Sequence, residues 1–208
     1  MGKIVIGIDQ SYTRTGITVL ENGNVFCIAS VDYKNSKNNS EKRLELKNVL
    51  NRLVHSITKS CNVETKDIMV IIERIRTFSG GHLSTQYLIT TGALVATIVD
   101  TFYKYKIPVY SVDTKAWKNA IVGTTKPKEN KYGINPNKYP TVLYMRDKGL
   151  LKYIAEKYTG RGKKGVIMVS KGRTRVPCKI NDDLADSYCI AMYGYLPKSK
   201  QKLKEEKF

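Results

Sequence analysis

The sequence predicts an α/β domain built on a mixed sheet that is antiparallel at first and parallel later. Three apolar runs open the chain with only short turns between them, which is typical of an antiparallel meander. After them, helical and strand-like segments alternate, which favours parallel strands joined by helices. We expect five strands with helices on both faces, a basic insertion before the last helix, and a single domain over residues 1–208.

The opening strands have the clearest pattern. Residues 3–10 (KIVIGIDQ) form a β-branched run that is typical of a strand buried on both faces. Residues 15–33 contain two strand-like runs, separated by a turn at Glu21-Asn22-Gly23-Asn24. A polar loop follows, and then a helix with leucine, valine and isoleucine at helical spacing, for which Ser40 is the expected cap.

The middle of the chain alternates between strand and helix. Residues 67–76 (DIMVIIERIR) form a strongly apolar strand that contains one acid, Glu73. Residues 84–106 form a long helix that is apolar over most of its surface. A strand over 107–113 and a short helix over 114–123, which ends at a glycine, complete this part.

The last third of the chain continues with less regular elements. Residues 124–140 form a loop rich in Lys, Pro and Asn, and 141–158 form an amphipathic helix. Residues 163–180 alternate apolar and polar side chains, which indicates a basic β-hairpin. A final helix begins at the three-aspartate cluster near residue 182, and the basic tail over about 197–208 is expected to be mobile.

The distribution of charge predicts a polyanionic partner. The chain has 36 basic and 18 acidic residues, a net charge of +18. Residues 115–179 contain 17 basic residues against three acidic ones and so carry +14 of it, most of it within the insertion over about 124–180. Such a field attracts the phosphate backbone of nucleic acids, although a solvated basic face is the plainer alternative. No apolar run reaches about 18 residues, so we expect no membrane span.

The cysteines and the N-terminal segment bear on the compartment. Cys27, Cys61, Cys178 and Cys189 are widely spaced and contain no CxxC pair, which favours free thiols over a zinc site. The segment MGKIVIGIDQ has the pattern of a strand rather than of a signal peptide. We therefore expect a cytoplasmic protein.

Several acids occur where a carboxylate is costly to bury. Asp9 ends the first strand, and Glu73 follows five consecutive apolar residues, so each must pair with a base or face a cation. Asp183 and Asp186 would share one face of the last helix, as would Asp182 and Asp186, and one of the three is expected to cap that helix. If these oxygens converge, they suit Mg²⁺ or Mn²⁺. Helix capping and arginine pairing are the alternatives.

Taken in order, these motifs resemble those of one family. IGIDQSYTRTGI, IIERIR, VYSVDTKAWKNAIVG and DLAD are similar to motifs of the RuvC-type Holliday junction resolvases of the RNase H-like superfamily, in particular a short phage-type branch. DDLADSYCIAM also resembles the last motif of the poxvirus resolvases. The resemblance implies a metal-dependent endodeoxyribonuclease that cleaves four-way junctions and leaves 5′-phosphate and 3′-hydroxyl ends. The long insertion extends the expected substrates to other branched DNA, and a phage-encoded enzyme would act in the host cytoplasm.

The resemblance also implies a role for each matching acid and for one lysine. Asp9, Glu73, Asp183 and Asp186 would hold two Mg²⁺ or Mn²⁺ ions, with Asp182 as the alternative to Asp183. Lys118 would either stabilise charge at the transition state or only contact a phosphate.

The family works as a homodimer on branched DNA. The helix over 84–106 would supply the dimer surface, with Tyr87, Leu94, Ile98 and Phe102 at the seam. Some members carry an aromatic wedge three residues after the strand glutamate, where this chain has Arg76, with Phe78 two residues later. The residues expected to contact DNA are Arg14, Arg74, Arg76, Phe78, Lys115, Lys118, Lys126, Lys128, Arg161, Lys163, Lys164, Lys171 and Arg173.

Other functions fit parts of the pattern. The actin-like ATPases and sugar kinases begin with a motif like GIDQSYTRTG, but they need a second domain with a glycine-rich phosphate motif, and no second copy occurs here. We therefore expect no nucleotide cofactor. A basic branched-DNA-binding protein with structural acids, or another RNase H-like nuclease, remains open.

Overall fold

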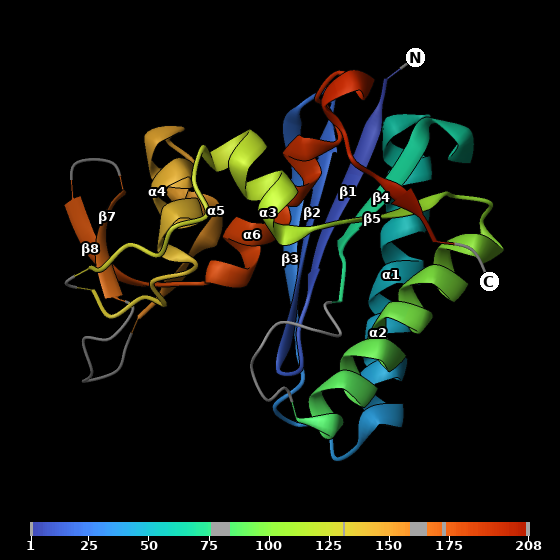
Figure 1. The fold of residues 1–208 in the computed structure, drawn as a ribbon, viewed down its shortest axis with the longest axis horizontal. Coiled ribbons are helices and arrows are strands. Elements are labelled where there is room, and N and C mark those ends of the chain that lie inside the picture. The colour runs from blue at the N-terminus through green and yellow to red at the C-terminus, as the bar shows by residue number, and fades with distance from the viewer. Residues whose placement is uncertain (1, 76–83, 131, 159–165, 172–173, 207–208) are drawn as a thin grey trace.

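Helices lie on both faces of a mixed sheet in this structure, a computed structural model (Figure 1). It describes residues 2–75, 84–130, 132–158, 166–171 and 174–206. Helices α1 (Asn39–Cys61) and α2 (Thr85–Lys104) cover one face, and α6 (Asp182–Tyr193) covers the other. The four cysteines are free, as expected, and none of the described helices is long and apolar enough to span a membrane.

Among the described residues, the main sheet has six strands in the order β3-β2-β1-β4-β5-β9. Their bounds are β1 Ile4–Gln10, β2 Arg14–Glu21, β3 Asn24–Asp32, β4 Ile68–Glu73, β5 Val109–Val112 and β9 Lys204–Glu205. β2 pairs antiparallel with both β1 and β3, whereas β4 pairs parallel with both β1 and β5. The predicted change from antiparallel to parallel pairing is confirmed, and the predicted count of five strands is one short.

The additional strand comes from the C-terminal tail, which was expected to be mobile. β9 pairs antiparallel with the edge strand β5, and Ser111 Oγ donates to Glu206 Oε1 at 2.5 Å. Upstream, the side-chain amide nitrogen of Gln201 lies within hydrogen-bond distance of three backbone carbonyls at the end of α6 and just after it. The tail therefore closes an otherwise open sheet edge, which a strand must have covered or paired to avoid association with other chains.

The segment between β5 and α6, which includes the basic insertion, folds into short elements beside α6. They are α3 (Thr114–Trp117), a π-helical turn (Lys118–Val122), α4 (Tyr139–Asp147), α5 (Leu151–Ile154), and a small sheet of β6 (Ala155–Lys157), β8 (Thr174–Ile180) and β7 (Val166–Lys171). The predicted hairpin is confirmed as β7–β8, which Figure 1 shows far from α1 and α2. The predicted helix over 141–158 is wrong in extent, because Gly149 adopts a φ of 70° and separates α4 from α5.

The cap of helix α1 differs from the prediction. Asn38, not Ser40, caps α1, because its side chain accepts a hydrogen bond from the amide of Glu41 at 2.9 Å. Ser84 caps α2 in the same way, through the amide of Tyr87. In each case the capping oxygen satisfies an amide that has no partner within the helix.

The sheet separates two apolar cores because side chains alternate along each strand. On β1, Ile4, Ile6 and Ile8 pack with residues of α1 and α2, whereas Val5 packs with α6. Asp9 lies two residues beyond Gly7 and four beyond Val5, so it belongs to the face that α6 covers. The alternation of a single strand thus determines which layer supplies partners for this acid.

Helix α2 contributes Leu94, Ile98 and Phe102 to the core that it shares with α1, and all three are fully buried. They cannot form the expected dimer seam, because their side chains are already covered within one chain. Tyr87 is half-buried and remains available. The helix is apolar over most of its surface, so its sequence did not distinguish the core face from the outer face.

Two glycines allow α6 to lie directly on the sheet. A Cβ atom on Gly7 would overlap the backbone of Ser187 and Ala191, and one on Gly16 would overlap the backbone carbonyl of Asp183. Next to them, the buried hydroxyl groups of Thr18 and Ser187 form a hydrogen bond of 2.8 Å. The register pairs Asp9 with Gly16, so the start of α6 is held beside the end of β1.

We predict that Gly7→Ala lowers the free energy of unfolding by roughly 1–3 kcal/mol or more, because the added methyl group meets backbone that cannot move aside. Chemical denaturation measures this change. Gly92→Ala in α2 is the control, since nothing lies within 4 Å of a Cβ there and alanine favours a helix by up to about 1 kcal/mol. Equal stability of Gly7→Ala and the wild type would contradict the close approach.

Candidate active site

Two acids meet at one end of the sheet. Asp9 is the second-last residue of β1, and Glu73 is the last residue of the neighbouring parallel strand β4. The register pairs Ile8 with Ile72, which sets Asp9 beside Glu73. Because the carboxyl ends of parallel strands share one edge and both acids are on the α6 face, their carboxylates lie near the start of α6.

Helix α6 brings two further acids to the same place. Asp183 and Asp186 are three residues apart on the helix, and Asp183 lies over Gly16 at the close approach to β2. Asp9 and Asp186 are buried, with side-chain exposures of 11% and 5%, and Asp183 is at 15%. The predicted convergence of β1, β4 and α6 is therefore seen in the geometry.

A lysine that the sequence analysis did not single out lies at the centre of these acids. The Lys138 Nζ atom is 3.2 Å from Asp9 Oδ2 and 3.6 Å from Asp186 Oδ2, and it also donates a hydrogen bond to Asp183 Oδ1. Lys138 immediately precedes α4 in the basic insertion. It was one of 17 basic residues in residues 115–179, and nothing in its local sequence distinguished it from the others.

The Glu73 carboxylate has two hydrogen-bond partners other than Lys138. Its Oε1 atom accepts a hydrogen bond from Thr114 Oγ1 at 2.6 Å, and its Oε2 atom accepts one from the indole nitrogen of Trp117 at 3.1 Å. Both donors come from α3, which directly follows β5. These contacts fix the direction of the carboxylate, and neither donor was predicted, because their role depends on the approach of α3 to β4.

Asp186 is fixed in a similar way. Its Oδ1 atom accepts a hydrogen bond from Thr141 Oγ1 at 2.7 Å, in a buried position. Thr141 lies in the first turn of α4, and its hydroxyl oxygen is also 2.6 Å from the carbonyl oxygen of Lys138, so the single hydroxyl proton is shared between the two acceptors. One threonine thus ties the lysine backbone to the acid that the lysine side chain contacts.

Burial and mutual repulsion set the electrostatics of the site. Burial, together with the charges of Asp186 and Asp183, raises the pKa of Asp9 to about 7. Burial also raises the pKa of Asp186 to about 6, and burial together with Asp9 raises the pKa of Glu73. Burial alone would lower the pKa of Lys138, but the surrounding carboxylates raise it well above its usual value. The site therefore holds more negative charge than its lysine balances.

Lys118 lies in the next layer rather than among the carboxylates. Its Nζ atom donates to the carbonyl of Asn137 at 2.8 Å and lies 5.2 Å from the ring centre of Trp117. It is buried, and its charge acts on Asp186 and Glu73 from a distance. The predicted lysine is thus near the acids, while Lys138 contacts them.

The structure separates the roles of the neighbouring aspartates. Asn181 caps α6, since its side chain accepts from the amide of Leu184 at 3.4 Å, so the cap expected from one of the three aspartates is wrong. Asp183 contacts Lys138 directly, whereas Asp182 acts on it only through longer-range charge. This difference favours Asp183 as the member that faces the other acids.

Apart from the buried Lys118, the residues expected to contact DNA are exposed, engaged in ion pairs, or without a described side chain. Lys115, Lys126, Lys128 and Arg74 are exposed. Arg14 is already engaged, at 2.9 Å from Asp32 and 3.5 Å from Glu156. Only the backbone of Lys171 is described, in β7, and the residues that lie outside the described part of the chain are Arg76, Phe78, Arg161, Lys163, Lys164 and Arg173.

The donor set suits a hard divalent cation in its chemistry. Carboxylate oxygens from two elements, β1 and α6, already surround one positive group, and Mg²⁺ and Mn²⁺ prefer such oxygen ligands. In the part of the chain that the structure describes, however, no three of these acids are spaced as a preformed metal site. The ammonium group of Lys138 lies between them.

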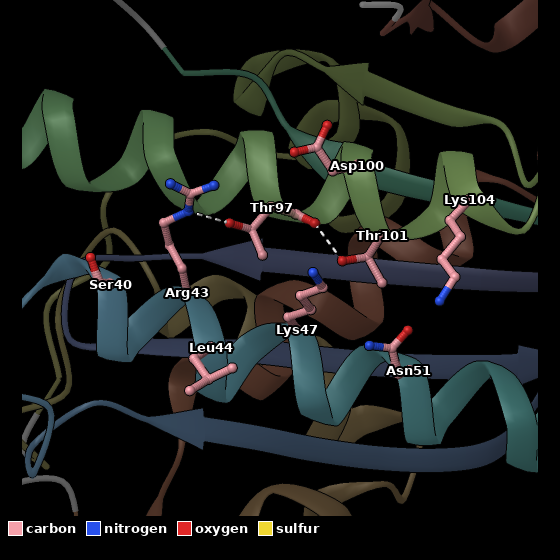
Figure 2. A pocket seen from close by; sticks show the side chains of 9 residues that line it. All are labelled: Ser40, Arg43, Leu44, Lys47, Asn51, Thr97, Asp100, Thr101 and Lys104. Carbon is pink, nitrogen blue, oxygen red and sulfur yellow. Dashed lines mark hydrogen bonds between the residues drawn. The ribbon is translucent and has the colours of Figure 1, made fainter.

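A cavity that lies away from the four acids lacks the features of an active site. It has a volume of about 320 Å³ and lies between α1 and α2, lined by Arg43, Lys47, Asp100 and Lys104 among others (Figure 2). Arg43 Nε donates to Thr97 Oγ1 at 2.9 Å across it. The helices that form it cover the face of the sheet opposite α6, and only one acid lines it.

Comparison with known proteins supports the fold. Two solved structures of Thermus thermophilus RuvC match, one in complex with a Holliday junction substrate and one described as the RuvC structure. Their TM-scores are 0.54 and 0.51, each at 16% identity, and the matches cover 91% of this chain and 90% and 91% of those chains. No family model and no curated protein matches the chain. The chain therefore has the RNase H-like fold of RuvC, as predicted.

We predict that the metal-free protein loses stability as the pH rises from about 4 to 7. The folded-state pKa of Asp9 is raised from 3.8 to about 7, so folding favours the protonated acid, and that contribution is lost as the pH passes through the folded value. The change is on the order of 4 kcal/mol for a shift of this size. Denaturation in EDTA at several pH values measures it.

The matched variants separate Asp9 from other acids. Asp9→Asn should make the decline smaller by the share of Asp9, because it leaves no carboxyl group to ionise there, whereas Asp186 and Glu73, whose pKa values are also raised, keep their shares. Asp32→Asn should retain it, because Asp32 lies in an exposed ion pair whose hydrogen bond from Arg14 lowers its pKa. A wild type whose stability rises over this range would contradict the account.

Proposed function

We propose that this chain is a metal-dependent, structure-selective endodeoxyribonuclease that cleaves four-way DNA junctions and other branched DNA. The observation that carries this proposal is the convergence of Asp9, Asp183 and Asp186 on one partly buried positive group, with Glu73 beside them. A RuvC structure of the same fold was solved with a Holliday junction substrate, which supports the substrate class. The products would carry 5′-phosphate and 3′-hydroxyl ends.

Asp9, Glu73, Asp183 and Asp186 would hold two Mg²⁺ or Mn²⁺ ions. Bound ions of this kind activate water and stabilise the attacking and leaving oxygens of a phosphoryl displacement. The protein would orient these acids for the ions: Thr114 and Trp117 of α3 fix Glu73, and Thr141 of the insertion fixes Asp186. Low local polarity strengthens each charge interaction there.

Basic residues of this chain would bind and orient the DNA. The segment over 115–179 carries +14 of the net charge, and Lys115, Lys126 and Lys128 are exposed on it. These side chains can neutralise backbone phosphates without reading sequence. The buried charge of Lys118 lies behind the acids, where it would stabilise negative charge on the reacting phosphate. We place this activity in the cytoplasm, that of the host if a phage encodes the chain.

One observation favours the second candidate, a branched-DNA-binding protein that does not cut. Lys138 already pairs with three of the acids, as it would if the cluster were a structural ion network. The two candidates share the same basic surface. They differ in whether a divalent ion enters the site, so a cleavage assay distinguishes them.

We also propose that the protein acts as a homodimer through the outer face of α2. Ile89, Ala93, Ala96, Asp100 and Tyr103 follow one another at spacings of four and three residues, and this set is here called the α2 stripe. Ile89 and Tyr103 are 56% and 75% exposed, which is high for large apolar side chains. The spacing is that of helices that pack together along their length.

We predict that Asp9→Asn and Glu73→Gln bind a labelled four-way junction with wild-type affinity but cut it at least about 1,000-fold more slowly. The loss follows from removing one charged ligand from a site that needs all of them. Gel assays with Mg²⁺ or Mn²⁺, on the junction, linear duplex and an RNA–DNA hybrid, measure binding and cutting. Glu64→Gln, at an exposed acid that pairs with Lys66, is the control with normal cutting. A wild type that binds but never nicks branched DNA would leave the binding protein as the function.

We predict that Ile89→Asp and Ala96→Arg convert a dimer to a monomer, because each places a charge on the α2 stripe. Light scattering coupled to size-exclusion chromatography measures the mass. Tyr153→Asp is the matched control, since Tyr153 is also exposed, at 39%, but lies on α5. A wild-type protein that is monomeric at assay concentrations would contradict the proposed dimer. A dimer that both α2 variants retain would contradict the α2 stripe as its interface.

A further inference from the structure

Lys138 contributes a partly buried positive charge at the centre of three acids. Its side chain is only 23% exposed, and it contacts Asp9, Asp183 and Asp186. If all four groups are ionised, this cluster carries a charge of −2. The lysine therefore reduces the repulsion between the acids but leaves the site attractive to further positive charge.

The oxygens that Lys138 contacts are those a metal ion would need. They are Asp9 Oδ2, Asp183 Oδ1 and Asp186 Oδ2, one from each carboxylate. A divalent ion bound to the same oxygens at about 2.1 Å would lie against the ammonium group, and two like charges at that separation repel strongly. The ammonium group and the ion therefore cannot both occupy this position.

We propose that Lys138 is an internal counter-ion that takes the place of a divalent cation in the metal-free protein, and that an entering divalent ion displaces its ammonium group from Asp9, Asp183 and Asp186. This inference rests on the metal site of the proposed function. It adds that one chain residue competes with the cofactor.

The surroundings of Lys138 indicate that its side chain moves and its backbone stays. Thr141 donates to the carbonyl of Lys138, and Lys118 donates to the carbonyl of the preceding residue, Asn137. These contacts hold the chain on both sides of the lysine Cα atom. The four-carbon stem of lysine is flexible, so the ammonium group can leave while the insertion keeps its place.

The first experiment compares Lys138→Met with the wild type, because methionine is unbranched, similar in length and uncharged. In EDTA the variant should melt roughly 10 °C lower, since removing one partner leaves buried acids without their counter-ion. Calorimetric titration with Mn²⁺ should show binding at least about 10-fold tighter than in the wild type. Saturating Mn²⁺ should restore most of the lost melting temperature.

Matched variants show whether the effect belongs to contact with the acids. Lys118→Met removes a buried lysine whose Nζ atom contacts a carbonyl instead, so its gain in Mn²⁺ affinity should be much smaller. Lys138→Arg keeps the charge and should bind Mn²⁺ no tighter than the wild type, and it serves if Lys138→Met does not fold in EDTA. Mn²⁺ binding to Lys138→Met that is equal to or weaker than wild-type binding would overturn the proposal.

A second experiment follows the displaced group directly. Acylation of lysine amines by a succinimidyl ester, read by mass spectrometry in the wild type, should label Lys138 at least about 5-fold faster once Mn²⁺ is added. Lys118 is the internal reference, and Asp9→Asn should reduce the response. Unchanged labelling at saturating Mn²⁺ would also overturn the proposal.

Neither readout depends on DNA cleavage, so the two proposals can fail separately. If Mn²⁺ displaces Lys138 but no substrate is cut, the counter-ion role stands and the nuclease function falls. If cleavage requires a metal but Lys138→Met binds it no tighter, the function stands and the counter-ion role falls. If neither protein binds Mn²⁺, both are wrong.

Discussion

The close packing of α6 on β1 and β2 is the constraint on which the candidate site depends. Gly7 and Gly16 allow this packing because the helix backbone occupies the space that their side chains would need. It sets Asp183 and Asp186 beside the ends of β1 and β4 and shields Asp9 from water. The packing that stabilises the core thus also creates buried, mutually repelling acids, which need a cation.

The basic insertion supplies that positive charge through Lys138, and the same contacts attach the insertion to the core. Lys138 and Thr141 reach the acids from the start of α4. A second tie runs through Glu156, which accepts a hydrogen bond from Asn181 at 2.9 Å and lies 3.5 Å from Arg14. Because both ties end at or next to residues of the site, the position of the basic surface and the arrangement of the acids depend on each other.

Much of the fold could be predicted because its signals are local. Alternation and β-branched runs identified the strands of the main sheet, and the spacing of Asp183 and Asp186 identified a shared helix face. The rest depends on tertiary contacts. Trp117 acquires a role only when α3 packs against β4, and Lys138 only when the insertion packs against α6. β9 forms because the edge of β5 is open to it, although its own sequence has no strand pattern.

The balance of charge bears on whether the acids are structural. A buried ion network that served stability alone would match each acid with a base, and apolar residues of similar size would often stabilise the fold as well or better. Here Asp9, Glu73, Asp183 and Asp186 face one contacting lysine, and Lys118 acts only from the next layer. A protein with a net charge of +18 has many basic residues that could pair with the remaining acids. Negative charge left unbalanced in such a chain favours a site that takes up positive charge from outside, beside a surface that attracts a polyanion.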